Sequence, residues 1–246
     1  MDTSAWLSVV WDYQPTLEVH QFIMREFDAR MRSNPKYLAH REWILANRSG
    51  YGEHAFHWMW KLITDSMPYK FAFLEVGVYC GQVLSLVQMM AQETGKDVEI
   101  VGVSPLAGGG PEGFPMFNYE EKIATTFNAF GLPIDNVTLI KGYSQDPRVI
   151  QKLEGKEGYF DIIFIDGSHK KKDVIMDIEN FDKFLKVGGL MVTDDSSNNL
   201  PMPEGVFAGI QEVSDAVDET LGVWPNYKHL FACQHDRVWE KLGERE

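Results

Sequence analysis

From Phe71 onward, short apolar runs alternate with segments of helical period, and this alternation limits the chain to few folds. Short uninterrupted apolar runs are typical of strands buried on both faces, which are usually parallel and joined by helices. The pattern predicts an α/β fold built on a doubly wound, mostly parallel, seven-stranded sheet. The expected strands cover residues 71–76, 98–103, 137–140, 160–166, 190–193, 227–233 and 237–241.

The segments between these runs have the apolar spacing of amphipathic helices. We expect helices at 83–93, 119–130, 147–153, 174–185 and 206–221. The tripeptide Val187-Gly188-Gly189 is expected to end the fourth of them, because glycine commonly follows a helix. The last two strands should form a closing antiparallel hairpin around Gln234-His235-Asp236.

Residues 1–68 differ from the rest: they are rich in Trp, Tyr, His and Met and contain no glycine-rich turn. Helix-like stretches at 17–32 and 54–66 predict an N-terminal helical cap, which packs on the main domain, residues 69–246, or joins subunits. Of these two roles we favour homo-oligomerisation. The segment has more aromatic surface than a free tail would carry, from Trp6, Trp11, Tyr13, Trp43, Trp58 and Trp60.

Composition narrows the classes of partner. The 246 residues include 23 Lys+Arg and 36 Asp+Glu, a net charge of −13, which opposes binding to nucleic acid. No apolar run approaches the roughly 20 residues of a bilayer span, so no membrane partner is expected. Cys80 and Cys233 have no metal-ligand spacing and favour a reducing, cytoplasmic location, although a disulfide between them stays open.

The first expected strand ends in Glu75-Val76-Gly77-Val78-Tyr79-Cys80-Gly81. In doubly wound sheets, ligands bind beyond the carboxyl ends of the strands. Gly77 allows a tight turn, and Gly81 allows the backbone to approach a ligand. The spacing is not that of the dinucleotide motif G-x-G-x-x-G, which disfavours a nicotinamide-dependent oxidoreductase. Glu75 would repel a pyrophosphate but can pair with an ammonium group on a cationic ligand.

Ser104 ends the next expected strand, where ribose-binding folds usually have Asp or Glu. Its hydroxyl forms only a neutral hydrogen bond to a sugar. Two interpretations stay open: Ser104 binds a cofactor, or Ser104-Pro105 is simply a turn.

Carboxylates follow the fourth and fifth expected strands. Asp166 ends one and Asp194-Asp195 ends the next, with His169 three residues after Asp166. Like charges this close require a cation, and all-oxygen ligands favour Mg²⁺, Mn²⁺ or Ca²⁺. A single strand-end Asp is also explained by helix capping. His169 can be a general base or simply a partly exposed histidine.

Three segments together resemble the class I S-adenosylmethionine-dependent methyltransferases: FLEVGVYCG at 73–81, FIDGSH at 164–169 and VGGLMVTDD at 187–195. Within that Rossmann-like superfamily, the chain is most similar to the branch of cephalosporin-hydroxylase-like proteins and macrolide-sugar O-methyltransferases. The resemblance covers roughly residues 70–220 and departs from the family where Ser104 replaces an acid.

The resemblance implies a role for each matched residue. It implies that S-adenosylmethionine contacts Glu75, Gly77, Tyr79 and Gly81, with Ser104, Ser144 and Gln145 as further candidate contacts. It implies that a divalent metal binds to Asp166, Asp194 and Asp195. His169 would remove the proton. The expected function is metal-assisted O-methylation of a small hydroxylated acceptor, such as a glycoside or another secondary metabolite. The alternative is a non-catalytic cofactor-binding subunit or sensor with the same fold.

Overall fold

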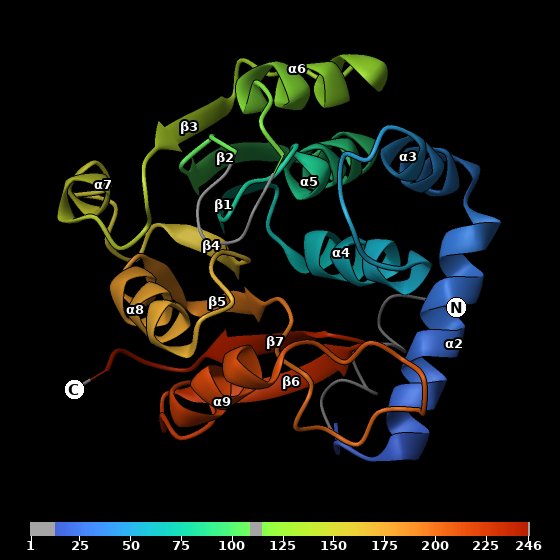
Figure 1. Ribbon diagram of the computed structural model, residues 1–246, viewed down its shortest axis with the longest axis vertical. Coiled ribbons are helices and arrows are strands. Elements are labelled where there is room, and N and C mark those ends of the chain that lie inside the picture. The colour runs from blue at the N-terminus through green and yellow to red at the C-terminus, as the bar shows by residue number, and fades with distance from the viewer. Residues whose placement is uncertain (1–12, 109–114, 246) are drawn as a thin grey trace.

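The computed structural model describes residues 13–108 and 115–245, so Trp6 and Trp11 lie outside the described residues. A seven-stranded sheet with the order β3-β2-β1-β4-β5-β7-β6 forms the centre, and it confirms the predicted α/β fold with its closing antiparallel hairpin (Figure 1). The strands are β1 (Lys70–Val76), β2 (Asp97–Ser104), β3 (Val137–Lys141), β4 (Phe160–Ile165), β5 (Leu185–Thr193), β6 (Tyr227–Cys233) and β7 (Asp236–Lys241).

Helices cover both faces of the sheet (Figure 1). Alternate residues of each strand point to opposite faces, so Phe73 packs in one hydrophobic cluster and Leu74 in the other. The first cluster is completed by α2 (Leu17–Ser33), α4 (His54–Ser66), α5 (Gln82–Glu93) and α6 (Tyr119–Ala129). The second is completed by α7 (Pro147–Gln151), α8 (Lys171–Asp182) and α9 (Gln211–Glu219).

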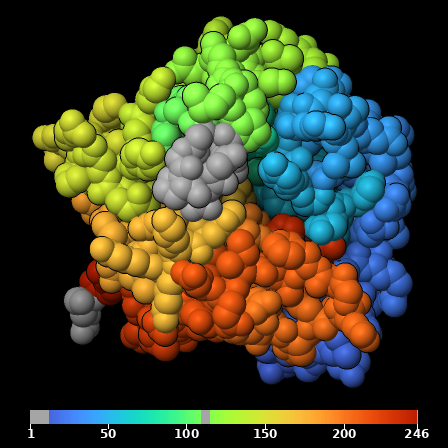
Figure 2. Space-filling model, viewed as in Figure 1, coloured from blue at the N-terminus to red at the C-terminus, as the bar shows by residue number. Residues whose placement is uncertain are grey.

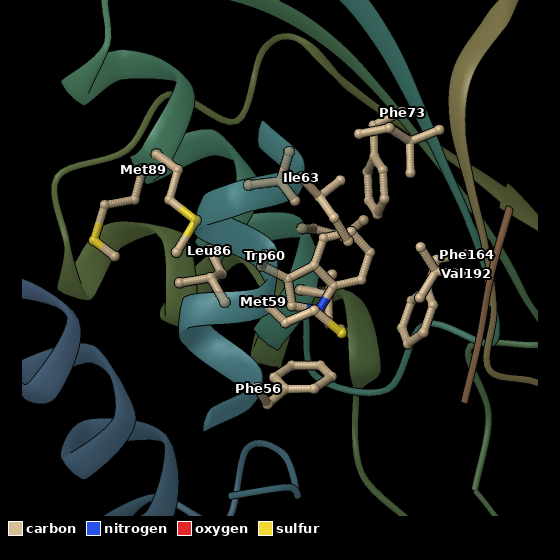
Figure 3. Packing of buried hydrophobic residues seen from close by; sticks show 14 of the residues in the cluster. Phe56, Met59, Trp60, Ile63, Phe73, Leu86, Met89, Phe164 and Val192 are labelled. Atoms are coloured by element: carbon tan, nitrogen blue, oxygen red, sulfur yellow. The ribbon is translucent and has the colours of Figure 1, made fainter. Parts of the chain in front are cut away.

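The N-terminal helices are part of the first hydrophobic cluster. Trp60 of α4 is fully buried, and its ring meets those of Phe73 and Phe164 edge-on, with centroids 5.6 and 5.1 Å apart (Figure 3). Burying a side chain of this size contributes about 2–3 kcal/mol. Residues before β1 therefore pack directly on the strands whose ends carry the predicted site.

Strand register aligns the predicted site residues along one edge. The sheet order reverses between β1 and β4, and Val76 pairs with Ile165 while Ile165 pairs with Thr193. The residues that follow these positions, including Asp166 and Asp194, therefore lie side by side at the carboxyl edge. Ligands of doubly wound folds bind at this switch point.

Three local expectations differ from the structure. A further helix, α3 (Pro35–Ala46), was not predicted, because the residues that it buries include His40 and Arg41 and so hide the apolar period. The expectation that Val187-Gly188-Gly189 ends a helix is wrong: α8 ends at Asp182, and these glycines lie in an irregular stretch of β5, where Gly188 has φ 83°.

The third difference is the start of α9. It begins at Gln211 rather than near Val206, because Gly205 and Gly209 have positive φ values of 77° and 104° that interrupt the helix. The disulfide left open is not formed, since Cys80 and Cys233 are both free and buried. None of the helices in the described part of the chain combines the length and the apolar character that crossing a membrane requires.

Candidate active site

A cavity of about 670 Å³ lies at the carboxyl edge of the sheet. This is a typical volume for a small-molecule site. In Figure 2 a small area of dark red C-terminal atoms lies between the cyan N-terminal segment and the orange segment that precedes α9. The cavity brings together nearly all the predicted site residues: its lining includes Glu75, Gly77, Tyr79, Ser104, Ser144, Gln145, Asp166, His169, Asp194 and Asp195.

Gly81 is the predicted residue that is not among those lining the cavity. It caps α5 with φ 77°, and a Cβ added there would lie 3.1 Å from Ile123 rather than in the cavity. Gly77 has φ 100°, and a Cβ would lie 1.7 Å from the carbonyl oxygen of Asp166. Gly77 is thus needed for close contact between two strand ends, and Gly81 for a left-handed turn into the helix.

Glu75 is a buried acid near the end of β1, two residues before Gly77. Its side chain lines the cavity although the residue is only 3% exposed, and its Oε2 atom has no hydrogen-bond partner among the described residues. Burial, and next the charge of Asp194, raise the pKa of Glu75 to about 8. A cationic ligand would stabilise the ionised form of Glu75.

The other predicted cofactor contacts have partners within the protein. The Ser104 hydroxyl donates to the Val78 carbonyl oxygen at 2.9 Å, which ties β2 to the turn after β1. Gln145 donates through Nε2 to Asp177 Oδ1 at 2.7 Å, and the Ser144 side chain also bonds to Asp177. These bonds hold Ser144 and Gln145 at the cavity wall.

The aromatic ring of Tyr79 packs in a group with Tyr51, Phe117 and Tyr119, at centroid distances of 5.6–5.9 Å. Tyr51 and Tyr119 also line the cavity. This wall offers planar apolar faces to a ligand.

The three predicted metal ligands stand at the ends of β4 and β5. Burial, followed by repulsion from Asp194, raises the pKa of Asp166 well above its usual range and that of Asp195 to about 6. Asp195 also has φ 50°, an uncommon conformation for a residue with a side chain. A divalent cation would relieve the repulsion between these carboxylates, although in the described part of the chain only Asp194 of the three belongs to a group whose ligating atoms all lie within 4.8 Å of one another.

His169 lies beside this group. Its Nε2 atom is 3.3 Å from Asp195 Oδ2, and its side chain is about one-third exposed, at 36%. An imidazole held by a carboxylate and open to the cavity has the geometry that a general base requires.

Sequence reasoning missed residues that reach the cavity from elsewhere in the chain. Glu53 immediately precedes α4, Phe56 lies in the first turn of α4, and His235 lies in the turn between β6 and β7. Arg41 of α3 donates to the Tyr51 carbonyl oxygen at 2.6 Å, and Gln82 donates to the same oxygen at 2.9 Å. The tertiary contacts of α3 therefore hold the segment that carries Glu53.

The position of His235 at the cavity could have been predicted from the sequence. A strand antiparallel to β5 must begin at the carboxyl edge, so the predicted turn Gln234-His235-Asp236 had to lie near Asp194. The segment at 50–53 has no such signal, because only the packing of α3 places it.

A doubly wound sheet whose switch-point cavity combines an acid-glycine turn with strand-end carboxylates defines an α/β protein built to bind a small molecule. Residues 74–196, half of the chain, match the family model described as a methyltransferase domain, and the chain belongs to this family of methyltransferases.

The chain is also similar to individual proteins. The chain is 31% identical over 179 residues to the uncharacterized protein R132 of Acanthamoeba polyphaga mimivirus, covering 70% of this chain and 76% of that protein. Its fold is similar to that of SAH-bound methyltransferase PaMTH1 of Podospora anserina, at 17% identity and TM-score 0.52, covering 97% of this chain and 93% of that one. CalS11, a TDP-rhamnose 3'-O-methyltransferase of calicheamicin biosynthesis, is similar at 14% identity and TM-score 0.55, covering 94% and 97%.

Proposed function

We propose that this protein transfers a methyl group from S-adenosylmethionine to a hydroxyl oxygen of a small molecule, such as a glycoside or another secondary metabolite. The observation that carries the proposal is that one cavity contains both the buried Glu75 with its glycine turn and the Asp166–Asp194–Asp195 group with His169 beside it. The first set suits a cationic cofactor, and the second suits the activation of a hydroxyl group.

Bound S-adenosylmethionine would supply an electrophilic methyl group on a sulfonium. Glu75 pairs with the cofactor's ammonium group, and the wall that includes Tyr79 accepts its apolar surface. Ser144 and Gln145, both held by Asp177, face the same ligand. The task of these residues is alignment, because in-line displacement depends mainly on the geometry of the nucleophile and the methyl carbon.

The carboxylates of Asp166, Asp194 and Asp195 would hold Mg²⁺, or Mn²⁺ or Ca²⁺, and a bound cation would lower the pKa of an acceptor hydroxyl. His169 accepts the proton of that hydroxyl at the ring nitrogen that does not face Asp195, while Nε2, 3.3 Å from Asp195 Oδ2, keeps its own proton. Asp195 orients the ring and stabilises the imidazolium that results.

The volume of the cavity supports a small acceptor rather than a macromolecule. A sugar hydroxyl is consistent with the fold similarity to CalS11, a TDP-rhamnose 3'-O-methyltransferase. The alternative, a cofactor-binding subunit or sensor without turnover, is favoured by Ser104, whose hydroxyl bonds to Val78 and leaves no acid at the end of β2.

The test is methyl transfer to a panel of glycosides, phenols and other hydroxylated molecules, with S-adenosylmethionine and Mg²⁺ present and product detected by mass. We expect a mass gain of one methyl group on an oxygen. Cofactor binding without turnover across the panel would instead support the sensor. Methylation on nitrogen or carbon alone would contradict the proposed acceptor atom.

A further inference from the structure

A second group of possible metal ligands lies on the other side of Asp194, away from Asp166. Asp194, His235 and Asp236 each offer one ligating atom, and these atoms all lie within 4.8 Å of one another. The Nε2 atom of His235 is 3.3 Å from Asp194 Oδ1 and 3.7 Å from Asp236 Oδ2. We call these three residues the hairpin site.

The backbone fixes this arrangement. Strand β7 runs antiparallel to β5 with Thr193 opposite Arg237, so the next pair in the same register is Asp194 and Asp236. His235 precedes β7, and its carbonyl oxygen accepts a hydrogen bond from the Ser196 amide at 2.7 Å. The three side chains therefore come together through sheet pairing rather than through flexible loops.

Asp236 is the observation that points to a missing ligand. The residue is fully buried, at 0% exposure, and among the described residues no N–H or hydroxyl donor reaches either carboxylate oxygen; the Asp194 carboxyl is its side-chain partner. Its nearest ionisable neighbours include the acids Asp194, Asp195 and Glu53. The cations of the same strand are paired elsewhere: Arg237 with Asp218 and Lys241 with Asp182 and Glu244. Buried carboxylates in proteins are normally paired or bound to metal.

The surroundings of His235 add an independent indication. Its Nε2 atom faces the two aspartates, while its Nδ1 atom lies 3.5 Å from Glu53 Oε2. Histidines that bind metal through one ring nitrogen usually direct the other at a carboxylate or carbonyl group, which orients the ring. Glu53 occupies that outer position here.

We propose that Asp194, His235 and Asp236 bind a divalent transition-metal ion, with Glu53 orienting His235. One imidazole and two carboxylates suit Mn²⁺, Fe²⁺, Co²⁺ or Zn²⁺ better than Mg²⁺ or Ca²⁺, which prefer oxygen ligands alone. The hairpin site shares only Asp194 with the Asp166–Asp194–Asp195 group. It does not depend on methyl transfer, and it can be tested without turnover.

Cobalt is a suitable probe, because Co²⁺ bound to imidazole and carboxylate gives visible absorption that reports its ligands. The full chain, first treated with chelator, is titrated with Co²⁺ without S-adenosylmethionine. We expect saturable binding that His235→Gln and Asp236→Asn each weaken at least tenfold, while the control variant Asp146→Asn, at the N-cap of α7, stays within threefold of the wild type.

Thermal unfolding separates a ligand role from a structural one. Without metal, Asp236→Asn should melt no lower than the wild type, because the change removes repulsion from Asp194, and Co²⁺ should raise its melting temperature less. If Asp236→Asn does not fold, Glu53→Gln is used instead, because the Glu53 side chain is 41% exposed. Loss of its carboxylate should weaken Co²⁺ binding about tenfold.

Two results would overturn the proposal. One is the absence of saturable Co²⁺ binding by the wild-type chain. The other is binding that Asp166→Asn or His169→Gln abolishes and that changes at His235, Asp236 and Glu53 leave intact, which would assign the ion to the Asp166 side alone. Failure of methyl transfer has no bearing on either readout.

Discussion

At the scale of the residue, Asp194 lies between two other carboxylates, Asp166 on β4's side and Asp236 on β7's side. Burial, and next the charge of Asp194, raise the pKa of both Asp166 and Asp236 well above its usual range. Groups perturbed in this way cluster at functional sites, so we attribute the crowding to function.

His169 is the residue on which proton removal depends. If it accepts the acceptor's proton, His169→Ala should lower turnover about 10²–10⁴-fold while cofactor affinity stays nearly constant. The pH–rate profile should also lose its acidic limb, because protonated imidazole accepts no proton. A variant that kept more than about a third of the turnover with the same limb would assign proton removal to the metal and solvent.

Asp177 gives a test by pH. Burial raises its pKa to about 7, well above 3.8. An unfolded chain releases this proton near pH 4 and the folded chain only near pH 7, so the wild type loses stability as the pH rises through this window. The free energy of unfolding of Asp177→Asn, measured in urea, should fall less than that of the wild type between pH 5 and 8. The difference between the two falls should be about 1–3 kcal/mol. An equal loss in both proteins would contradict the shifted pKa.

At the scale of the element, the sheet and its edge were predictable because apolar runs and strand-end acids are local patterns. Helix α3 and the 50–53 segment were not, since buried polar residues such as Arg41 define them and tertiary contacts place them. Gly188 shows the same limit: a glycine after a helical period indicates a helix end as readily as the irregular strand that the structure has. His235 was identified only as a turn residue, although the strand order places it in the cavity.

The turn after β1 supports a prediction of its own. Gly77→Ala should destabilise the chain by more than about 3 kcal/mol, because a positive φ and a clash with the Asp166 backbone add together. Gly131 is the matched control: it has φ 62° with nothing within 4 Å of an added Cβ, so Gly131→Ala should cost only about 1–2 kcal/mol. Equal losses in urea unfolding would show that the two strand ends are not in close contact.

At the scale of the whole molecule, the N-terminal helices are part of the core and also reach the cavity through Glu53 and Phe56. Their further role in joining subunits stays a prediction, as do the absence of nucleic-acid and membrane partners and the cytoplasmic location. Light scattering of the full chain should give a mass that is a multiple of 28.1 kDa. A monomer at micromolar concentrations would contradict the expected homo-oligomer.

The central claim is that the cavity at the switch point binds S-adenosylmethionine through Glu75. Calorimetry with S-adenosylmethionine and with its demethylated product, with and without Mg²⁺, tests it most directly. We expect one site per chain for both ligands and at least tenfold weaker binding of both by Glu75→Gln, which keeps the shape of the side chain but removes its charge. Absence of binding by the wild-type chain, or equal affinity in Glu75→Gln, would contradict the account.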